Sequence, residues 1–416
     1  MPLVIVKIDG DKGQQVDALN VHQFVQHDLE SLTVTLSRRQ RDESFALAYI
    51  FGHVSSIQRL RLEDGTVESL SKFLSLWDRH KQTISVHTLE LCGIMEWDTT
   101  ATALLNQICL DGMSGTTTLT KLKIFTLAFS IQGINLTYLR ELIIPMGRER
   151  TMYSLTSAIT TDSQLYRLEI GNLNLANLSE DILEFLCLRL YILPNLHTLV
   201  LTIKESEPTN MQRLARSIPG SVGNLKIVWH EPSFTDLALL APAMPTLKAL
   251  DLELVNQNTA QPSDPTALME IVVPLLEHCQ SLQHLAVGPI RKPVRQFILH
   301  PLLKVMSTWT TLKTCELGFP LVLDDACCDT IYLLVQNNKN IRDFQYPLSK
   351  GPKNFYPKLL HYLRLNRLRH QDLLLTNQIP LSLWPRLLEK AAQWPSVVFE
   401  ILKQKNDVLI INQSLE

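Results

Sequence analysis

The sequence predicts an α/β repeat solenoid, in which short parallel strands alternate with helices along one continuous array. A triplet of the form apolar-x-x-Leu-x-apolar recurs twelve times, and most copies begin 25 to 33 residues apart. Polar or proline turns often precede the triplet, and helical apolar stripes often follow it. A period of this length is typical of repeat architectures, because each unit buries its apolar face only against its neighbours. The copies begin at Leu29, Ile57, Val86, Leu119, Leu139, Leu165, Leu196, Val222, Leu247, Leu282, Leu312 and Ile341.

The centre of each copy predicts a short strand. The fourth position is leucine in ten of the twelve copies, with Cys315 and Phe344 as the exceptions. Positions four and six alternate with polar residues, which is the period of a strand with one buried face. We expect the first position to lie two residues before the strand and to fill the turn that leads into it.

The segments between the strands predict helices. Residues 67–74, 182–190 and 266–278 carry apolar side chains at helical spacing. Phe185 belongs to the second of these stripes, and Pro274 is expected to kink the third helix. The alternative is an array of helical repeats, in which the same leucines would lie on helix faces.

The pattern from Leu29 to Tyr346 resembles the long-repeat, ribonuclease-inhibitor-like branch of the leucine-rich-repeat family. The resemblance implies a horseshoe with a parallel sheet on the concave face and helices on the convex face. The family usually places Asn or Cys three residues after the sixth position, where the side chain bonds turn backbone. Because this sequence has other residues there, we expect the buried polar ladder to be missing or shifted and the repeats to be irregular. The residues at these positions are Gly65, Ile94, Leu127, Gly147 and Leu173.

Three regions are expected along the 416 residues. Residues 1–28 predict an amino-terminal cap of one strand, at Leu3–Ile8, and a helix. Residues 29–346 predict about twelve irregular repeats, with a protruding loop at 256–265 where the interval between copies is longest. Residues 347–416 predict a helical carboxy-terminal cap, because the open end of a solenoid sheet needs cover.

The carboxy-terminal segment has a second resemblance. It contains a Tyr-Leu-Arg-Leu-Asn-Arg stretch at 362–367, a Trp-Pro pair at 384–385 and a Phe-x-x-Leu helix at 399–402. This arrangement is similar to the closing segment of an uncharacterised diatom family of irregular leucine-rich-repeat proteins. The Gly expected before the later Arg is replaced by Leu368. The resemblance implies no known activity.

Composition and motifs exclude several classes of function. The net charge is −2, and no apolar run is long enough to span a membrane. The seven cysteines have irregular spacing, and the first residues lack the features of a signal peptide, so we expect reduced thiols and a cytoplasmic or nuclear location. No phosphate loop, dinucleotide fingerprint, nucleophile elbow or Cys-x-x-Cys pair occurs. We therefore expect no enzyme activity, catalytic residue, metal or cofactor.

Positions three, five and seven of each copy are the candidate binding residues, because they should point to the concave surface. Their charges are basic toward the amino-terminal end and acidic in the later copies. Such a surface suits an unidentified protein partner with matched charges, rather than a membrane or nucleic acid. The function expected is therefore a protein-interaction scaffold or recognition module. The candidate contacts are Arg59, Arg61, Glu90, Lys121, Lys123, Glu141, Arg167, Glu169, Lys226, Asp251, Glu253 and Glu316.

Two other functions stay open. A substrate-recognition subunit of a ubiquitin ligase would need an F-box-like helical segment, and residues 1–28 are too short and strand-like to supply one. Anion or nucleic-acid binding through the basic stretch 339–370 is the other, and its affinity would fall steeply with salt. The candidate basic patch consists of Lys350, Lys353, Lys358, Arg364, Arg367 and Arg369.

Overall fold

The computed structural model describes most of the repeats. The described residues are 4–9, 28–36, 48, 50–63, 73, 75, 77, 85–93, 119–125, 138–145, 147–230, 238–255, 272–279, 281–288, 296–318, 325–346, 355–368, 389, 392, 395, 398 and 399. The chain divides into two compact units, Met1–Pro232 and Ser233–Glu416. The helix predicted within residues 1–28 and the loop predicted at 256–265 lie outside the described residues, as does nearly all of the helix predicted at 67–74.

The first unit is built on a sheet whose strands follow chain order. Strand β1 (Val4–Asp9) lies antiparallel beside β2 (Asp28–Leu36), so the edge strand expected at Leu3–Ile8 is present one residue later. From β2 onward each strand pairs in parallel with the next. The further strands are β3 (Ser56–Glu63), β4 (Ser85–Cys92), β5 (Lys121–Phe125), β6 (Glu141–Ile144), β7 (Arg167–Asn174), β8 (Thr198–Glu205) and β9 (Asn224–His230).

The apolar anchors of the copies form the core. Positions one, four and six are buried in every copy except the last, where Tyr346 at position six is half-buried. Leu168 pairs in register with Leu142 on one side and Leu199 on the other, and all three are fully buried. Because these leucines lie on paired strands, the alternative of a helical repeat array is wrong for the described repeats.

The first anchor lies where it was expected in the copies from Leu119 onward, two residues before the strand. In the first three copies this expectation is wrong. Strands β2, β3 and β4 begin one residue before the anchor, so Leu29, Ile57 and Val86 are themselves paired in the sheet. These longer strands extend the parallel sheet at the amino-terminal end of the repeats.

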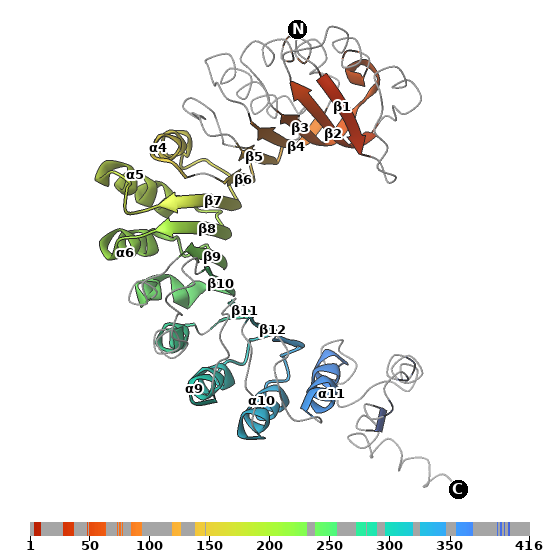
Figure 1. Ribbon diagram of the computed structural model, residues 1–416, viewed down its shortest axis with the longest axis vertical. Helices are drawn as coiled ribbons and strands as arrows, with labels where there is room; N and C mark the ends of the chain where they lie inside the picture. Colours follow the sequence, from red (N-terminus) through yellow and green to blue (C-terminus); the bar gives the residue numbers. More distant parts are fainter. Residues whose placement is uncertain are drawn as a thin grey trace. The chain divides into compact units, whose positions relative to one another are not determined.

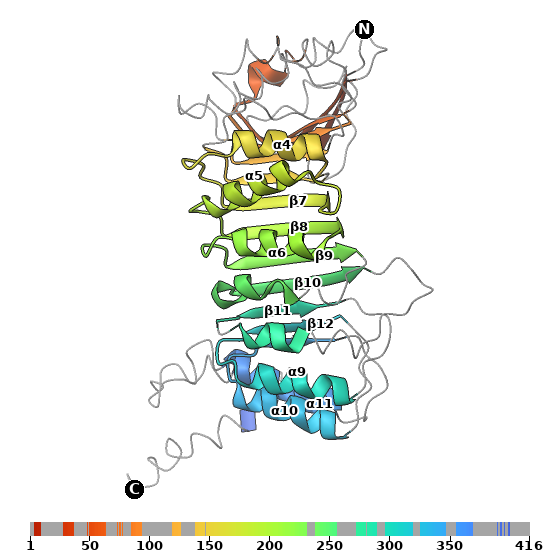
Figure 2. The ribbon, with the colours of Figure 1, turned by 90° about the vertical axis from the view of Figure 1, so that its left-hand side faces the viewer.

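Helices cover one face of the first sheet. Figures 1 and 2 show α4 (Glu149–Ala158), α5 (Glu180–Tyr191) and α6 (Pro208–Ser217) side by side on that face. Helix α5 buries Ile182, Leu183, Leu186 and Leu190 against the sheet. Phe185 was expected in this stripe but is 47% exposed. The reason is geometric, because at about 100° per residue Phe185 lies about 60° outside the arc of the buried side chains.

The second unit repeats the arrangement. Strands β10 (Ala249–Val255), β11 (His284–Val287), β12 (Thr314–Leu317) and β13 (Asp343–Gln345) pair in parallel in chain order. A 3-10 helix, η3 (Ala241–Thr246), precedes β10, and residues 272–277 are helical within the span predicted around Pro274. Helices α9 (Gln296–Ser307) and α10 (Asp325–Asn337) lie side by side on one face of this sheet (Figure 1).

Helix α11 (Phe355–Leu368) lies in the segment predicted as a carboxy-terminal cap and packs beside α10. Its buried Asn366 donates side-chain hydrogen bonds to the carbonyl oxygens of Val335, Asn338 and Ile341, at 2.9, 3.2 and 2.9 Å. Asn338, also buried, donates in turn to the carbonyl of Trp309. Val335 lies in the last turn of α10 and Asn338 follows the end of this helix, where backbone acceptors lack helical partners. Asn366 therefore ties α11 to the last repeat.

Each unit has a leucine-rich-repeat fold, with parallel strands in chain order and helices on one face. The usual Asn or Cys is replaced at position nine by Leu173, which is fully buried, and buried asparagines occur instead at Asn338 and Asn366. None of the described helices has the length and apolarity needed to cross a bilayer. We call the sheet face that carries positions three, five and seven, opposite the helices, the open face.

Candidate functional site

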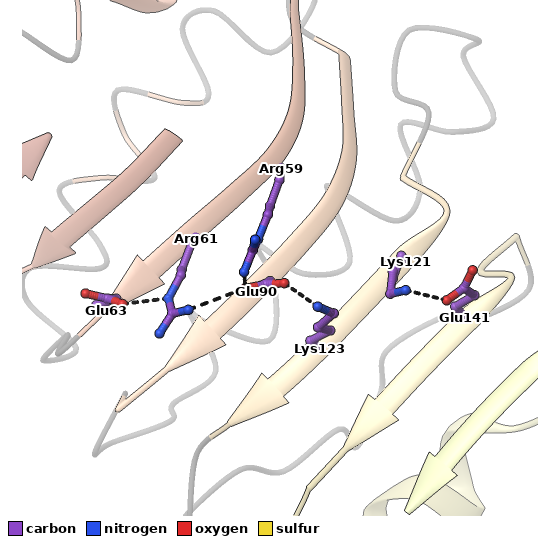
Figure 3. Close-up of polar contacts among 7 residues, drawn as sticks. All are labelled: Arg59, Arg61, Glu63, Glu90, Lys121, Lys123 and Glu141. Carbon is purple, nitrogen blue, oxygen red and sulfur yellow. Dashed lines mark hydrogen bonds and ion pairs between the residues drawn. The ribbon is translucent and has the colours of Figure 1, made fainter. Parts of the chain in front are cut away.

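The register of β3 to β6 aligns charged side chains on the open face of the first unit. At position three, Arg59 neighbours Thr88, which neighbours Lys121 and then Glu141. Position five aligns Arg61, Glu90 and Lys123 in the same way. Adjacent strands lie about 4.8 Å apart, so these side chains meet. Figure 3 shows the resulting charged cluster, which consists of Arg59, Arg61, Glu63, Glu90, Lys121, Lys123 and Glu141.

Glu90 lies at the centre of the charged cluster. Its Oε2 accepts a hydrogen bond from Arg59 Nη2 at 2.8 Å, and its Oε1 accepts one from Lys123 Nζ at 2.6 Å. Arg61 Nη1 lies 3.8 Å from the same Oε2. The Glu90 side chain is only 1% exposed, whereas that of Arg59 is 47% exposed. One buried carboxylate therefore holds cations from both flanking strands.

Two further ion pairs extend the charged cluster. Arg61 Nε lies 2.6 Å from Glu63 Oε1, and Lys121 Nζ lies 2.6 Å from Glu141 Oε2 (Figure 3). All four of these side chains are between about a quarter and a third exposed. Exposed pairs of this kind contribute little to stability individually. Their effect here is to fix where the charged groups stand on the sheet.

The pKa of Glu90 shows which influence dominates. Burial works to raise the pKa of this carboxyl, but the hydrogen bonds from Arg59 and Lys123 outweigh burial and hold the pKa below its ordinary value of 4.5. Glu90 is therefore charged at neutral pH. It was predicted as a direct partner contact, and its burial corrects that prediction: Glu90 positions the cations around it.

The remaining candidates of the first unit lie further along the open face. Arg167 and Glu169 on β7 pair with each other at 3.0 Å, and both are about one third exposed. Lys226 on β9 is half-buried. Buried Ile143 and Val200 occupy position five of β6 and β8. These apolar residues interrupt the row of charges at position five. At position three, however, Glu141 of the charged cluster neighbours Arg167 in register, so the predicted contacts are continuous from β3 to β7 and are interrupted before Lys226.

The acidic candidates of the second unit are spread over its open face. Asp251 and Glu253 on β10 are half-buried, and Glu316 on β12 is exposed. Ala286 on β11 lies in register between Asp251 and Glu316. The register therefore keeps these two carboxylates two strands apart.

The described members of the candidate basic patch do not share one face. Lys358 Nζ lies 4.2 Å from the centre of the Tyr332 ring, in a cation–π contact. Arg367 donates from Nε to the carbonyl of Arg342 at 2.8 Å, and its Nη2 lies 3.6 Å from Asp343 Oδ1. Along α11, Lys358 and Arg367 point about 180° apart at about 100° per residue. Lys350, Lys353 and Arg369 lie outside the described residues, and half-buried Arg364 completes the set.

Phe125 was expected on the open face as a position-seven residue but was not selected among the candidate contacts. It ends β5 at position seven, in register with Cys92, and is 44% exposed. Among the large apolar side chains that the structure describes as exposed, it is the one that lies on the open face of a strand. The sequence did contain a signal for this residue, because position seven is aromatic in this copy alone among its neighbours. The neighbouring copies have Glu63, Cys92 and Pro145 at that position.

The chemistry of two buried cysteines, Cys279 and Cys315, does not favour nucleophilic catalysis. Burial raises the pKa of the Cys279 thiol to about 12, and it raises the pKa of Cys315 as well. Since the thiolate is the reactive form, both side chains are inert at neutral pH. Within the described part of the chain, no three His, Cys, Asp or Glu side chains are grouped so that they could bind a metal ion.

Comparisons with known proteins add likenesses of fold. None of the protein-family models matches the chain, and none of the curated proteins does. A solved leucine-rich-repeat-containing protein, LegL7 from Legionella pneumophila, is similar over 79% of this chain and 97% of its own length, with 14% identity and a TM-score of 0.41. TLR13, in a complex with ssRNA13, is similar over 83% of this chain and 54% of its own length, with 14% identity and a TM-score of 0.34.

A protein from Bacteroides fragilis is similar over 76% of this chain and 74% of its own length, with 12% identity and a TM-score of 0.30. The fold assignment rests on the strand register and on the helices described above. The resemblances to the ribonuclease-inhibitor-like branch and to the diatom family stay predictions.

Proposed function

We propose that this chain is a non-enzymatic protein-interaction module and that the open face of its first unit is the binding surface. The observation that carries the proposal is the charged cluster, in which buried Glu90 holds exposed Arg59 and half-buried Lys123 in fixed positions. Because the cations are already held in place before binding, less side-chain entropy is lost when a partner binds. Among the described helices of this unit, α4, α5 and α6 lie on the opposite face of the sheet.

The residue types on this surface support a protein partner. Arg and aromatic residues are enriched among the side chains that contribute most to protein–protein affinity. Arg59 and Arg61 on β3 and Phe125 on β5 supply both types within three adjacent strands. Cys92, Cys187, Cys279 and Cys315 form no disulfide bond, which supports a search for the partner in the cytoplasm or nucleus. The chemistry of the surface thus favours recognition of a polypeptide.

Paired surface variants test the proposal. The parent chain and each variant are immobilised separately and incubated with lysate from the cells that produce the protein. The amounts of captured partner are then compared between parent and variants by mass spectrometry. We expect Arg61→Gln combined with Phe125→Ala to reduce capture of the specific partner at least tenfold, because both changes remove contacts on the open face. Phe185→Ala combined with Leu188→Ala, which alters exposed residues of α5, should leave capture unchanged.

Both double variants must first match the parent chain in circular dichroism and melting temperature. The proposal fails if the α5 variant loses the partner while the open-face variant retains it. It fails equally if neither variant changes the amount captured.

A further inference from the structure

The proposed function does not specify the sign of the charge that the open face of the first unit presents to a partner. Four cations, Arg59, Arg61, Lys121 and Lys123, line the open face of β3 and β5. Of the three carboxylates in the charged cluster, Glu90 is buried, so only Glu63 and Glu141 remain at the surface. Glu90 keeps its charge, so four cations against three carboxylates leave the charged cluster with a net charge of +1. We infer that the partner presents an acidic polypeptide segment with an apolar anchor residue, and this inference rests on the proposed function.

The β2 neighbours of the two arginines carry no charge. In register, Arg59 neighbours Ser31 on β2, and Arg61 neighbours Thr33. Both β2 residues have short neutral hydroxyl side chains, so neither competes for the guanidinium groups with a charge of its own. On the other side the guanidinium groups already contact Glu90. An incoming Asp or Glu side chain therefore meets two arginines along β3, and Arg binds carboxylates through paired, charge-assisted hydrogen bonds.

Phe125 supplies the second contact. It lies two strands across from Arg61, through Glu90 and Lys123, and two residues further along. With strands about 4.8 Å apart and a rise of about 3.3 Å per residue, these two backbone positions are about 12 Å apart. The exposed ring offers an apolar contact next to the cationic surface. A partner segment therefore needs a carboxylate and an apolar side chain separated by about this distance.

The spacing defines the segment further. An extended segment covers about 12 Å in about four residues, and a helix covers it in about eight. The acidic residues and the apolar anchor should accordingly recur in bound sequences at one of these two spacings. A basic segment is disfavoured because it would face the net positive charge of the charged cluster.

A peptide selection tests the inference without knowledge of the natural partner. Random 16-residue peptides displayed on their own messenger RNA are selected on the full chain, and in parallel on the Arg61→Gln, Phe125→Ala double variant. We expect peptides enriched on the parent chain alone to carry two or more acids and an apolar residue at one of the two spacings. Their affinities, measured by fluorescence anisotropy, should fall at least tenfold with either single substitution and stay unchanged with Phe185→Ala.

Salt provides a readout that needs no variant, because raising NaCl from 50 to 300 mM should weaken peptide binding several-fold through screening.

The inference is overturned if the enriched peptides are basic or neutral, if they bind the double variant equally, or if nothing is enriched over that variant. It is also overturned if an oligothymidylate of 16 nucleotides displaces the peptides at a lower concentration than a free acidic peptide does. Capture of a partner through the open face without an acidic segment would leave the proposed function standing and remove only this inference.

Discussion

Replacing Gly171 with alanine should destabilise the first unit by about 3 kcal/mol, at the upper end of the usual cost of overpacking. A Cβ at this position would stand 2.4 Å from the carbonyl oxygen of Pro145 and 2.7 Å from its carbonyl carbon. Both atoms belong to backbone, so no side chain can rotate to make room. The Gly171 carbonyl also accepts a hydrogen bond from the Gly147 amide at 2.6 Å, so separating the two segments breaks this bond.

The measurement is thermal unfolding combined with hydrogen exchange. For a unit of this size, about 3 kcal/mol corresponds to a fall in melting temperature of roughly 6–12 °C. Amide protection should decrease first around 141–147 and 167–174, where the two segments meet. Gly52→Ala is the matched control, because nothing lies within 4 Å of its added methyl group and it sits in a helical segment. If both variants melt at the temperature of the parent chain, the close approach described for Gly171 is wrong.

Glu90→Gln is expected to cost about 2 kcal/mol at neutral pH. The substitution keeps the shape of the side chain but replaces two charge-assisted hydrogen bonds, from Arg59 and Lys123, by weaker neutral-acceptor bonds. Partial hydration of exposed Arg59 and of half-buried Lys123 limits the loss. Glu169→Gln is the control, because it also alters a position-five carboxylate paired with an arginine, but one that is about one third exposed. Such a pair contributes less than about 1 kcal/mol.

The effect of Glu90→Gln should depend on pH in a defined direction. The pKa of Glu90 in the folded chain is lower than its ordinary value of 4.5, despite the opposing effect of burial. Its contribution to stability is therefore fully present above about pH 4.5 and is lost as the pH falls through the folded pKa. Denaturant unfolding between pH 7 and pH 3 should show the parent and Glu90→Gln chains converging in stability. A constant difference down to pH 3 would contradict a charged, buried Glu90.

The repeat architecture could be predicted because it depends on local patterning. Leu168, Leu199 and Leu250 recur at the fourth position, and the burial of each follows from the same apolar alternation. The lengths of β2, β3 and β4 could not be predicted, because they depend on pairing with neighbouring strands. Phe185 was misplaced because the sequence does not show how far the buried stripe of this helix extends around its axis. The packing of the helix on the sheet determines which side chains are buried.

The candidate site could be predicted only in part. The pattern placed Arg59, Arg61 and Lys123 on the open face, and the register confirms that they share it. The burial of Glu90 was missed because position five is nominally a surface position. Cations from β3 and β5 approach it from both sides, and their long side chains were not considered in the pattern. Asn366 was missed for a similar reason, because its role is set by free carbonyls in the preceding repeat.

Site-specific photo-crosslinking tests the central claim, that partners bind the open face of the first unit. Phe125 on β5 and Phe185 on α5 are exposed to a similar extent, 44% and 47%, so each can be replaced by p-benzoylphenylalanine with a comparable change in size. The chain carrying the probe at 125 should form a discrete covalent adduct with its partner on irradiation in the producing cells, and the chain with the probe at 185 should not. An adduct formed from position 185 and absent from position 125 would contradict the assignment of the binding surface.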